Sequence, residues 1–252
     1  MKQNYLQWNI RVLKTALKKI GINVFIIIAI DFLFWTLLSF TLSYFILFIR
    51  TKYNSIDIPA DFGAQGIEVI ERTTASAKEL YNLIVISIIL FGAIFILASG
   101  ILKGLIWALT AKVKISFKYI IKFFAMNSIL SGLWFILSIA ALIILNIYAA
   151  PKIILIMFLI YLYITTVSYA LFTKNEKISC IKQAIKLSLG KVRLFLLPCT
   201  LILSIAFILF LLLSFISYRI AFPYTIYLIE IVSIAYIGII RYYLLELIKE
   251  LS

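Results

Sequence analysis

The sequence has 252 residues, of which 65% are hydrophobic and only 13% are charged. A soluble domain averages about 45–50% apolar and about 25% charged residues, so this composition excludes an ordinary soluble protein. The net charge of +14 does not predict nucleic acid as a partner, because membrane proteins concentrate lysine and arginine in their cytoplasmic loops.

The chain contains no histidine, and the usual nucleophile, zinc-protease and nucleotide-binding motifs do not occur in it. Histidine is the commonest general base and metal ligand. We therefore expect no enzymatic activity, no metal and no cofactor. The two cysteines, Cys180 and Cys199, lack the spacing of a zinc or redox site and are expected to be unpaired.

Six apolar runs are long enough to cross the hydrocarbon core of a membrane, about 30 Å thick, as α-helices. Strands of a membrane barrel would be about ten residues long and would alternate in polarity, unlike these runs. The sequence therefore predicts an all-α, polytopic membrane protein that forms a single domain over residues 1–252. The expected spans are 22–49, 83–102, 123–148, 153–172, 194–217 and 222–240.

The boundary between the third and fourth spans rests on the stretch "AAPK" at 149–152. Pro151 disfavours helical geometry at the residue before it, so a tight turn is expected there. A second proline, Pro198, is expected to kink the fifth span, which neighbouring helices can accommodate.

The distribution of basic residues predicts the orientation of the chain. The N-terminal segment, the 103–122 and 174–193 connectors and the C-terminal segment together carry 18 lysines and arginines, against 6 on the other side. The more basic side is expected to face the cytoplasm. Both termini are therefore predicted to be cytoplasmic, in the plasma membrane of a prokaryotic cell.

The segment 51–82 is expected to be an extracytoplasmic loop that contains a short amphipathic surface helix. Asp61 is a candidate N-cap for that helix, because aspartate side chains accept hydrogen bonds from free N–H groups at a helix start. The shared face of the helix is expected to consist of Ile67, Ile70, Thr74 and Ala77.

Three similar stretches each precede a span that is expected to run from the cytoplasmic side to the outer side. They are "LKTALKK" (13–19), "FKYIIKF" (117–123) and "IKQAIKL" (181–187). They suggest a three-unit repeat, 5–102, 111–172 and 177–246, in which a basic amphipathic interfacial helix leads a helical hairpin. The alternative is that the same lysine bias simply occurs three times. The paired lysines, expected to contact the anionic inner leaflet of the lipid bilayer, are Lys14/Lys18, Lys118/Lys122 and Lys182/Lys186.

Helical periodicity supports two of these interfacial helices. In each, residues of one apolar stripe recur every three or four positions, with lysines beside them. The first stripe consists of Leu6, Ile10, Leu13, Leu17 and Ile20, and the third of Ile178, Ile181, Ile185 and Leu189.

The third stretch, extended to "CIKQAIKLSLGKVRLFLLPCTLIL", resembles an element of several six-span prokaryotic membrane families. These include the membrane domain attached to some glycerophosphoryl diester phosphodiesterases, in which an "A-x-K-x-S"-like cytoplasmic helix runs into a span. Ala184, Lys186 and Ser188 match that pattern. The resemblance implies a six-span membrane fold. Its enzymatic part is not expected to carry over, because these residues include no phosphodiesterase domain, histidine or acidic metal cluster.

Two carboxyl groups are expected at membrane depth, Asp31 in the first span and Glu230 in the sixth. Counted from opposite sides, they could share one level near the midplane, where ionisable groups are functional candidates for binding or relaying an ion or proton. The alternative is that each carboxyl ties helices together. Lys103 and Arg241 are expected to extend toward the inner interface, which leaves no cation deep in the membrane.

The stretch "GILKG" places Gly100 and Gly104 one helical turn apart, with Ala108 next in the row. Small residues at this spacing allow two membrane helices to approach closely. The pattern predicts a packing contact rather than a site.

The function most consistent with these patterns is a non-catalytic membrane scaffold that associates with lipid, with a partner protein or with further copies of itself. The alternative is a small transporter or channel subunit that uses Asp31 and Glu230. A third hypothesis is a membrane-embedded lipid enzyme, for which the same two carboxyls are the only catalytic candidates. A water-accessible cavity at either carboxyl would favour the alternative.

Overall fold

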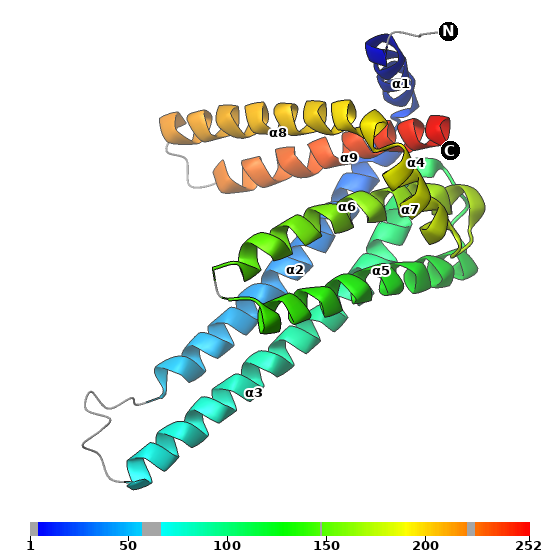
Figure 1. Ribbon diagram of the computed structural model, residues 1–252. Coiled ribbons are helices and arrows are strands. Elements are labelled where there is room, and N and C mark those ends of the chain that lie inside the picture. Colours follow the sequence, from blue (N-terminus) through cyan, green and yellow to red (C-terminus); the bar gives the residue numbers. More distant parts are fainter. Residues whose placement is uncertain (1–4, 57–66, 147, 221–224) are drawn as a thin grey trace.

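A computed structural model describes residues 5–56, 67–146, 148–220 and 225–252 (Figure 1). These residues form helices and short connections, and no strand occurs among them. The elements are α1 (Tyr5–Lys19), α2 (Asn23–Asn54), α3 (Ile67–Ala98), η1 (Ser99–Lys103), α4 (Gly104–Ala111), α5 (Phe117–Ile144), α6 (Ala150–Asn175), α7 (Cys180–Gly190), α8 (Val192–Ile220) and α9 (Thr225–Leu251).

Six of the described helical segments are long and apolar enough to cross a membrane, which confirms the predicted all-α fold with six membrane-length helices. α3, η1 and α4 join into one of these segments, 45 residues long. A break separates α5 from α6, and Pro151 lies in the first turn of α6, where its missing N–H costs no hydrogen bond. The segments are Asn23–Asn54, Ile67–Ala111, Phe117–Ile144, Ala150–Asn175, Val192–Phe215 and Ile231–Leu251.

The segment expected to be an outer loop is largely helical. α2 continues to Asn54, and α3 starts at Ile67 and runs into its span without a break. No glycine or proline occurs between 67 and 91, so nothing ends the helix there. The expected separate surface helix is therefore wrong. Asp61 lies outside the described residues.

The predicted shared face of this segment is exposed in α3. Residues half-buried against the rest of the chain recur one or two turns apart and are Val69, Thr73, Ser76 and Leu80, whereas Ile67, Ile70, Thr74 and Ala77 are exposed. The Lys52 ammonium meets the Glu79 carboxylate at 2.7 Å and links α2 to α3 in this extension.

The helices form three neighbouring pairs, α2 with α3, α5 with α6 and α8 with α9 (Figure 1). α9 also contacts α1, α2, α4 and α6, so the last helix holds a central position. We call the end formed by the starts of α2, α5 and α8 and the ends of α4, α6 and α9 the basic end. The short helices α1 and α7 lie there, and in this view α1 runs across the direction of α9.

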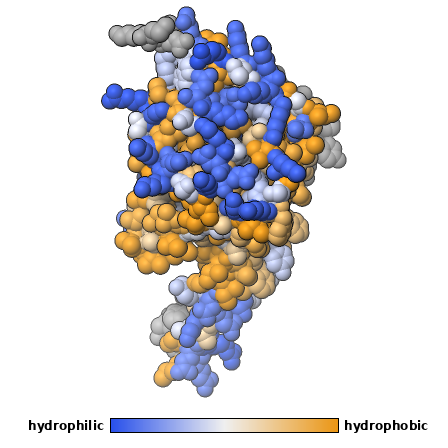
Figure 2. Space-filling model, turned by 90° about the vertical axis from the view of Figure 1, so that its right-hand side faces the viewer, coloured by the Kyte–Doolittle hydropathy of each residue, from blue (hydrophilic) through white to orange (hydrophobic). Residues whose placement is uncertain are grey.

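The basic end is the right-hand side of Figure 1 and faces the viewer in Figure 2, where hydrophilic residues cover much of it. Apolar side chains gather below it, and the tip of α2 and α3 is hydrophilic again. The buried core also lies near the basic end, where an aromatic cluster joins α4, α5 and α6. This cluster consists of Trp107, Tyr119, Phe123, Tyr169 and Phe172.

The "GILKG" stretch makes the close contact that its small residues predict. A Cβ atom on Gly100 would lie 2.4 Å from the Phe124 ring of α5, and one on Gly104 would lie 3.0 Å from the Phe123 ring. Ala108, the next residue in this row, is fully buried. The backbone of η1 and α4 therefore packs directly on α5.

We predict that Gly100→Ala lowers the free energy of unfolding by about 1–3 kcal/mol, because the added methyl group overpacks this contact. Gly132→Ala is the matched control, since nothing lies within 4 Å of a Cβ at that position, and the helix propensity of alanine favours it. Unfolding of both variants in detergent micelles, followed by circular dichroism, measures the difference. Equal stability of the two variants would contradict this packing.

Candidate functional site

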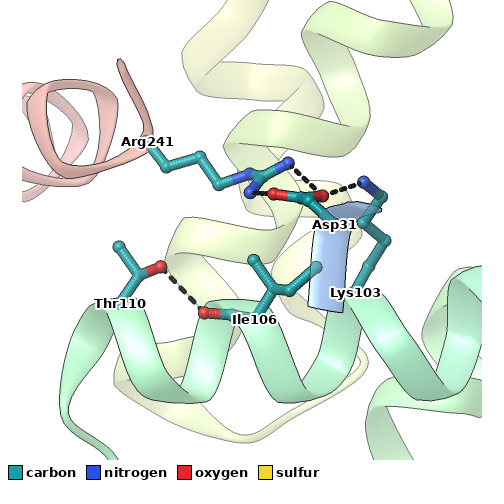
Figure 3. Close-up of polar contacts among 5 residues, drawn as sticks. All are labelled: Asp31, Lys103, Ile106, Thr110 and Arg241. Atoms are coloured by element: carbon teal, nitrogen blue, oxygen red, sulfur yellow. Dashed lines mark hydrogen bonds and ion pairs between the residues drawn. The ribbon is translucent and has the colours of Figure 1, made fainter. Parts of the chain in front are cut away.

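Asp31 is the centre of a buried group of three charged side chains (Figure 3). Its carboxylate accepts a hydrogen bond from the Lys103 ammonium at 2.8 Å and two from the Arg241 guanidinium, of which the bond to Nη2 is 2.9 Å long. Side-chain exposure is 1% for Asp31, 8% for Arg241 and 15% for Lys103. We call this group the Asp31 triad.

Three helices supply the triad from distant parts of the sequence. Asp31 is eight residues from the start of α2, Lys103 ends η1, and Arg241 is ten residues before the end of α9. At 1.5 Å per residue, each lies about 12–15 Å from the basic end of its helical segment. The three charges therefore meet at one level. Thr110, also drawn in Figure 3, bonds instead to the Ile106 carbonyl of its own helix at 2.8 Å.

The triad contains one carboxylate and two cations, so a single counter-charge serves both. A buried cation without compensation is unfavourable in a medium of low dielectric constant. The Lys103 ammonium has a second stabilising partner, because its Nζ lies 4.1 Å from the centroid of the Phe34 ring and 5.6 Å from that of Trp35. Cation–π attraction of this kind strengthens when water is excluded.

The expectation that Lys103 and Arg241 extend to the inner interface is wrong, as is the expectation that no cation lies deep in the bundle. Both side chains turn toward Asp31. Both residues lie at the ends of apolar runs in the sequence, which is also where interfacial lysines and arginines lie. The distinction depends on which helices are neighbours, and periodicity within one helix does not contain that information.

Glu230 is in α9, eleven residues before Arg241, and its side chain lies outside the described residues. Eleven residues of helix correspond to about 16 Å. Because Asp31 is level with Arg241, the α9 backbone separates Asp31 and Glu230 along the bundle instead of placing them at one level. Asp31 is sealed by its two cationic partners, and ion or proton relay by the two carboxyls remains a prediction.

A second buried polar group lies one helical turn from the triad. The Asn127 amide of α5 donates to the Ser99 hydroxyl at 2.8 Å and accepts a hydrogen bond from the Tyr169 hydroxyl of α6. Ser131 and Tyr161 continue the contact between α5 and α6 at 2.8 Å. Sequence reasoning missed this group, although an asparagine inside an apolar run was an available signal.

η1 connects the two polar groups, since Ser99 is its first residue and Lys103 its last. It is a π-helical turn, which has a wider ring than an α-helical turn and is often found at functional sites. Here it directs the Ser99 side chain to α5 and the Lys103 side chain to α2. The arrangement holds helices together through satisfied polar contacts, and the described residues bring no three cysteine or acidic side chains together as metal ligands would be.

α1 and α7, the two basic helices at this end, share one pattern of burial. Val12 and Ala16 of α1 are buried, as are Cys180 and Ala184, the residues aligned with them in α7. The stripes predicted from periodicity remain largely exposed on both helices, and so do the paired lysines Lys14, Lys18, Lys182 and Lys186.

The second basic stretch differs from the other two. α5 starts at Phe117 and continues to Ile144, so Lys118 and Lys122 belong to the first turns of a membrane-length helix. The Ser116 hydroxyl accepts a hydrogen bond from the Tyr119 N–H and caps that helix. The separate interfacial helix expected here is not formed.

α1 is fastened to the end of α9 by several polar contacts. The Tyr243 hydroxyl donates to Asn9 at 2.8 Å, which is buried. Arg11 meets Glu250 at 3.1 Å and Lys19 meets Glu246 at 2.5 Å. Two of the basic residues of α1 are therefore neutralised by α9.

No protein-family model, curated protein or solved structure matches this chain. The chemistry of its residues and their arrangement are therefore the basis for assigning a function.

We predict that Asp31→Ala lowers the free energy of unfolding by about 3–5 kcal/mol, because two buried cations lose their counter-ion. The double variant Asp31→Ala/Arg241→Met should recover part of that loss, since it removes one of the stranded charges. Chemical unfolding in detergent micelles measures both.

The control for this experiment is Glu79→Gln, which breaks the exposed pair with Lys52 at the other end of α2. Exposed pairs contribute little to stability, so its unfolding midpoint should not change. If Asp31→Ala unfolds at the same midpoint as the wild type, the triad contributes no more to stability than this exposed pair, and the prediction is wrong.

Proposed function

We propose that this chain is a non-catalytic, multi-pass membrane scaffold that associates with anionic lipid through its basic end. In this proposal the bundle consists of three hairpins, and α1 and α7 lie in the headgroup layer of the inner leaflet of a prokaryotic plasma membrane. The observation that carries the proposal is that both helices bury a face of small residues on the bundle while an apolar stripe and a row of lysines stay exposed. A helix with these faces suits a membrane interface.

The way the basic segments dock supports a repeated architecture. α7 packs on α6, which precedes it, and the start of α5 packs near η1 and α4, which precede it. No hairpin precedes α1 in the described chain, and α1 packs instead on α9, which ends the third hairpin. Each basic segment therefore packs on the last helical segment of another hairpin. Chance recurrence of lysines would not require this regularity.

The sealed Asp31 carboxylate supports a structural role rather than transport. A carrier must expose its coupling group to water in at least one state, whereas Asp31 is 1% exposed and bonded to two cations. Its contacts join α2, η1 and α9, as a scaffold requires.

We predict that Lys14→Gln/Lys18→Gln reduces the preference of the protein for phosphatidylglycerol over phosphatidylcholine. Each lysine near an acidic membrane surface contributes about 1 kcal/mol of attraction, which is a factor of about five. Quenching of tryptophan fluorescence by brominated lipids in reconstituted vesicles reports the preference. Trp8 lies on the same helix as the two altered lysines, and its indole donates a hydrogen bond to Glu250 of α9.

Arg72→Gln/Lys78→Gln is the matched control, because it removes the same charge from an exposed part of α3 at the opposite end. Its lipid preference should equal that of the wild type. Equal losses in the two double variants would indicate a general charge effect and would refute the role of α1.

The proposed topology has a separate test in single cysteines at two exposed positions, Ala75→Cys on α3 and Gln183→Cys on α7. An impermeant maleimide applied to intact cells should label position 75, and position 183 only after permeabilisation. Both cysteines are introduced separately into a Cys199→Ala variant, so that Cys199 cannot react. Burial raises the pKa of the Cys180 thiol to about 11, so Cys180 should remain unlabelled near neutral pH. Labelling of both positions from one side would refute the topology.

A further inference from the structure

A groove of about 560 Å³ opens at the basic end between the end of α6, α7 and the end of α9. Ligand sites commonly have volumes of about 300–1,000 Å³. Three lysines from two helices and a connection line this groove: Lys174, Lys186 and Lys191. Among the described residues that line it, none has an acidic side chain.

These lysines retain free hydrogen-bond donors. The Lys191 ammonium donates to the Leu251 carbonyl at 2.5 Å, and the Lys174 ammonium donates to the Ser252 hydroxyl at 3.4 Å. An ammonium group has three N–H donors, so two remain on each. Within the described part of the chain, Lys186 forms no ion pair.

Stabilisation of helix ends does not account for all of this positive charge. α6, α7 and α9 all end at the groove, and each C-terminus carries about half a negative charge. The three lysine charges therefore exceed the partial charges of the three helix ends, and the backbone carboxylate of Ser252, which also lines the groove, offsets part of that excess. An anion in the groove would neutralise the remainder.

The corresponding surface of α1 has a different environment. There Arg11 and Lys19 are paired with Glu250 and Glu246 of α9, whereas Lys14 and Lys18 stay exposed on the same helix. The two basic helices have similar sequences and similar buried faces. The hollow beside α1 is smaller, at about 380 Å³, and residues of α1 alone line it, whereas α6, α7 and α9 share the groove beside α7.

The groove also has apolar walls, formed by Leu171, Leu187 and Leu251. We propose that it binds the phosphate group of an anionic ligand, as in the headgroup of an anionic phospholipid. Lysines bind phosphate as concentrated point charges, and leucines beside them suit the glycerol and first methylenes of a lipid. This site rests on the proposed function and narrows it, from a diffuse basic surface to one place.

The test uses the full chain in neutral detergent at two salt concentrations, because salt screens diffuse attraction more strongly than attraction inside a groove. Dioctanoyl phosphatidylglycerol, dioctanoyl phosphatidylcholine and inorganic phosphate are titrated separately. Acetylation of each lysine, quantified by mass spectrometry, reports protection. We expect phosphatidylglycerol to protect Lys186 and Lys191 severalfold at high salt and to leave Lys14 and Lys182 unprotected.

The outcomes separate the source of the phosphate. Protection by phosphatidylglycerol alone identifies a lipid headgroup, and protection by inorganic phosphate as well identifies a site that also accepts phosphate compounds from solution. Either result supports the site. Protection by phosphatidylcholine to the same degree, or by none of the three, overturns it.

Two double variants distinguish the groove from the proposed function on which it rests. Lys186→Gln/Lys191→Gln should weaken binding of phosphatidylglycerol at least fivefold more than Lys14→Gln/Lys182→Gln, which removes the same charge outside the groove; fivefold is the effect of about one surface lysine. Equal losses would overturn the groove and leave a diffuse basic surface. If neither double variant loses affinity for phosphatidylglycerol, both proposals are wrong. Unchanged circular dichroism of the variants confirms folding.

Discussion

The pairing of Asp31 with Lys103 and Arg241 is the constraint on which the rest of this bundle depends. A carboxylate and two cations 12–15 Å along apolar helices are each unfavourable alone, and together they satisfy one another. The first, second and last membrane-length segments can therefore pack only in the register in which these charges meet. Hydrophobic contacts alone would allow these apolar helices to pack in several registers along their axes.

Two other contacts follow from that register. Arg241 fixes the position of α9, and the residues that hold α1, from Tyr243 to Glu250, follow within the next three turns. Lys103 fixes the position of η1, and Ser99, at the opposite end of this π-helical turn, meets Asn127 of α5. The polar contacts thus form a connected path from α1 through α9 and α2 to α5 and α6.

Length, apolar content and period were sufficient to predict six helices, the break near Pro151 and the close approach at Gly100, because each depends on residues near in sequence. The triad could not be predicted in this way. Asp31 and Arg241 are 210 residues apart, and nothing in either helix indicates its partner. The π-helical turn was equally hidden, since its wider ring depends on tertiary contacts. The N-terminal part of α3 was mispredicted because charged residues there suggested a loop, whereas the absence of glycine and proline mattered more.

The three lysine pairs show why sequence equivalence does not imply equivalent chemistry. Lys118 and Lys122 lie in the first turns of a membrane-length helix. The basic face of α1 lies beside Glu246 and Glu250, which neutralise Arg11 and Lys19. Lys186 of α7 instead faces a groove with two further lysines and three helix C-termini. If one ancestral unit supplied all three segments, acids on α9 have paired two basic residues of α1 within the chain and left Lys14 and Lys18 exposed. That difference makes the surroundings of each lysine, rather than its position in the repeat, decisive for binding an anion.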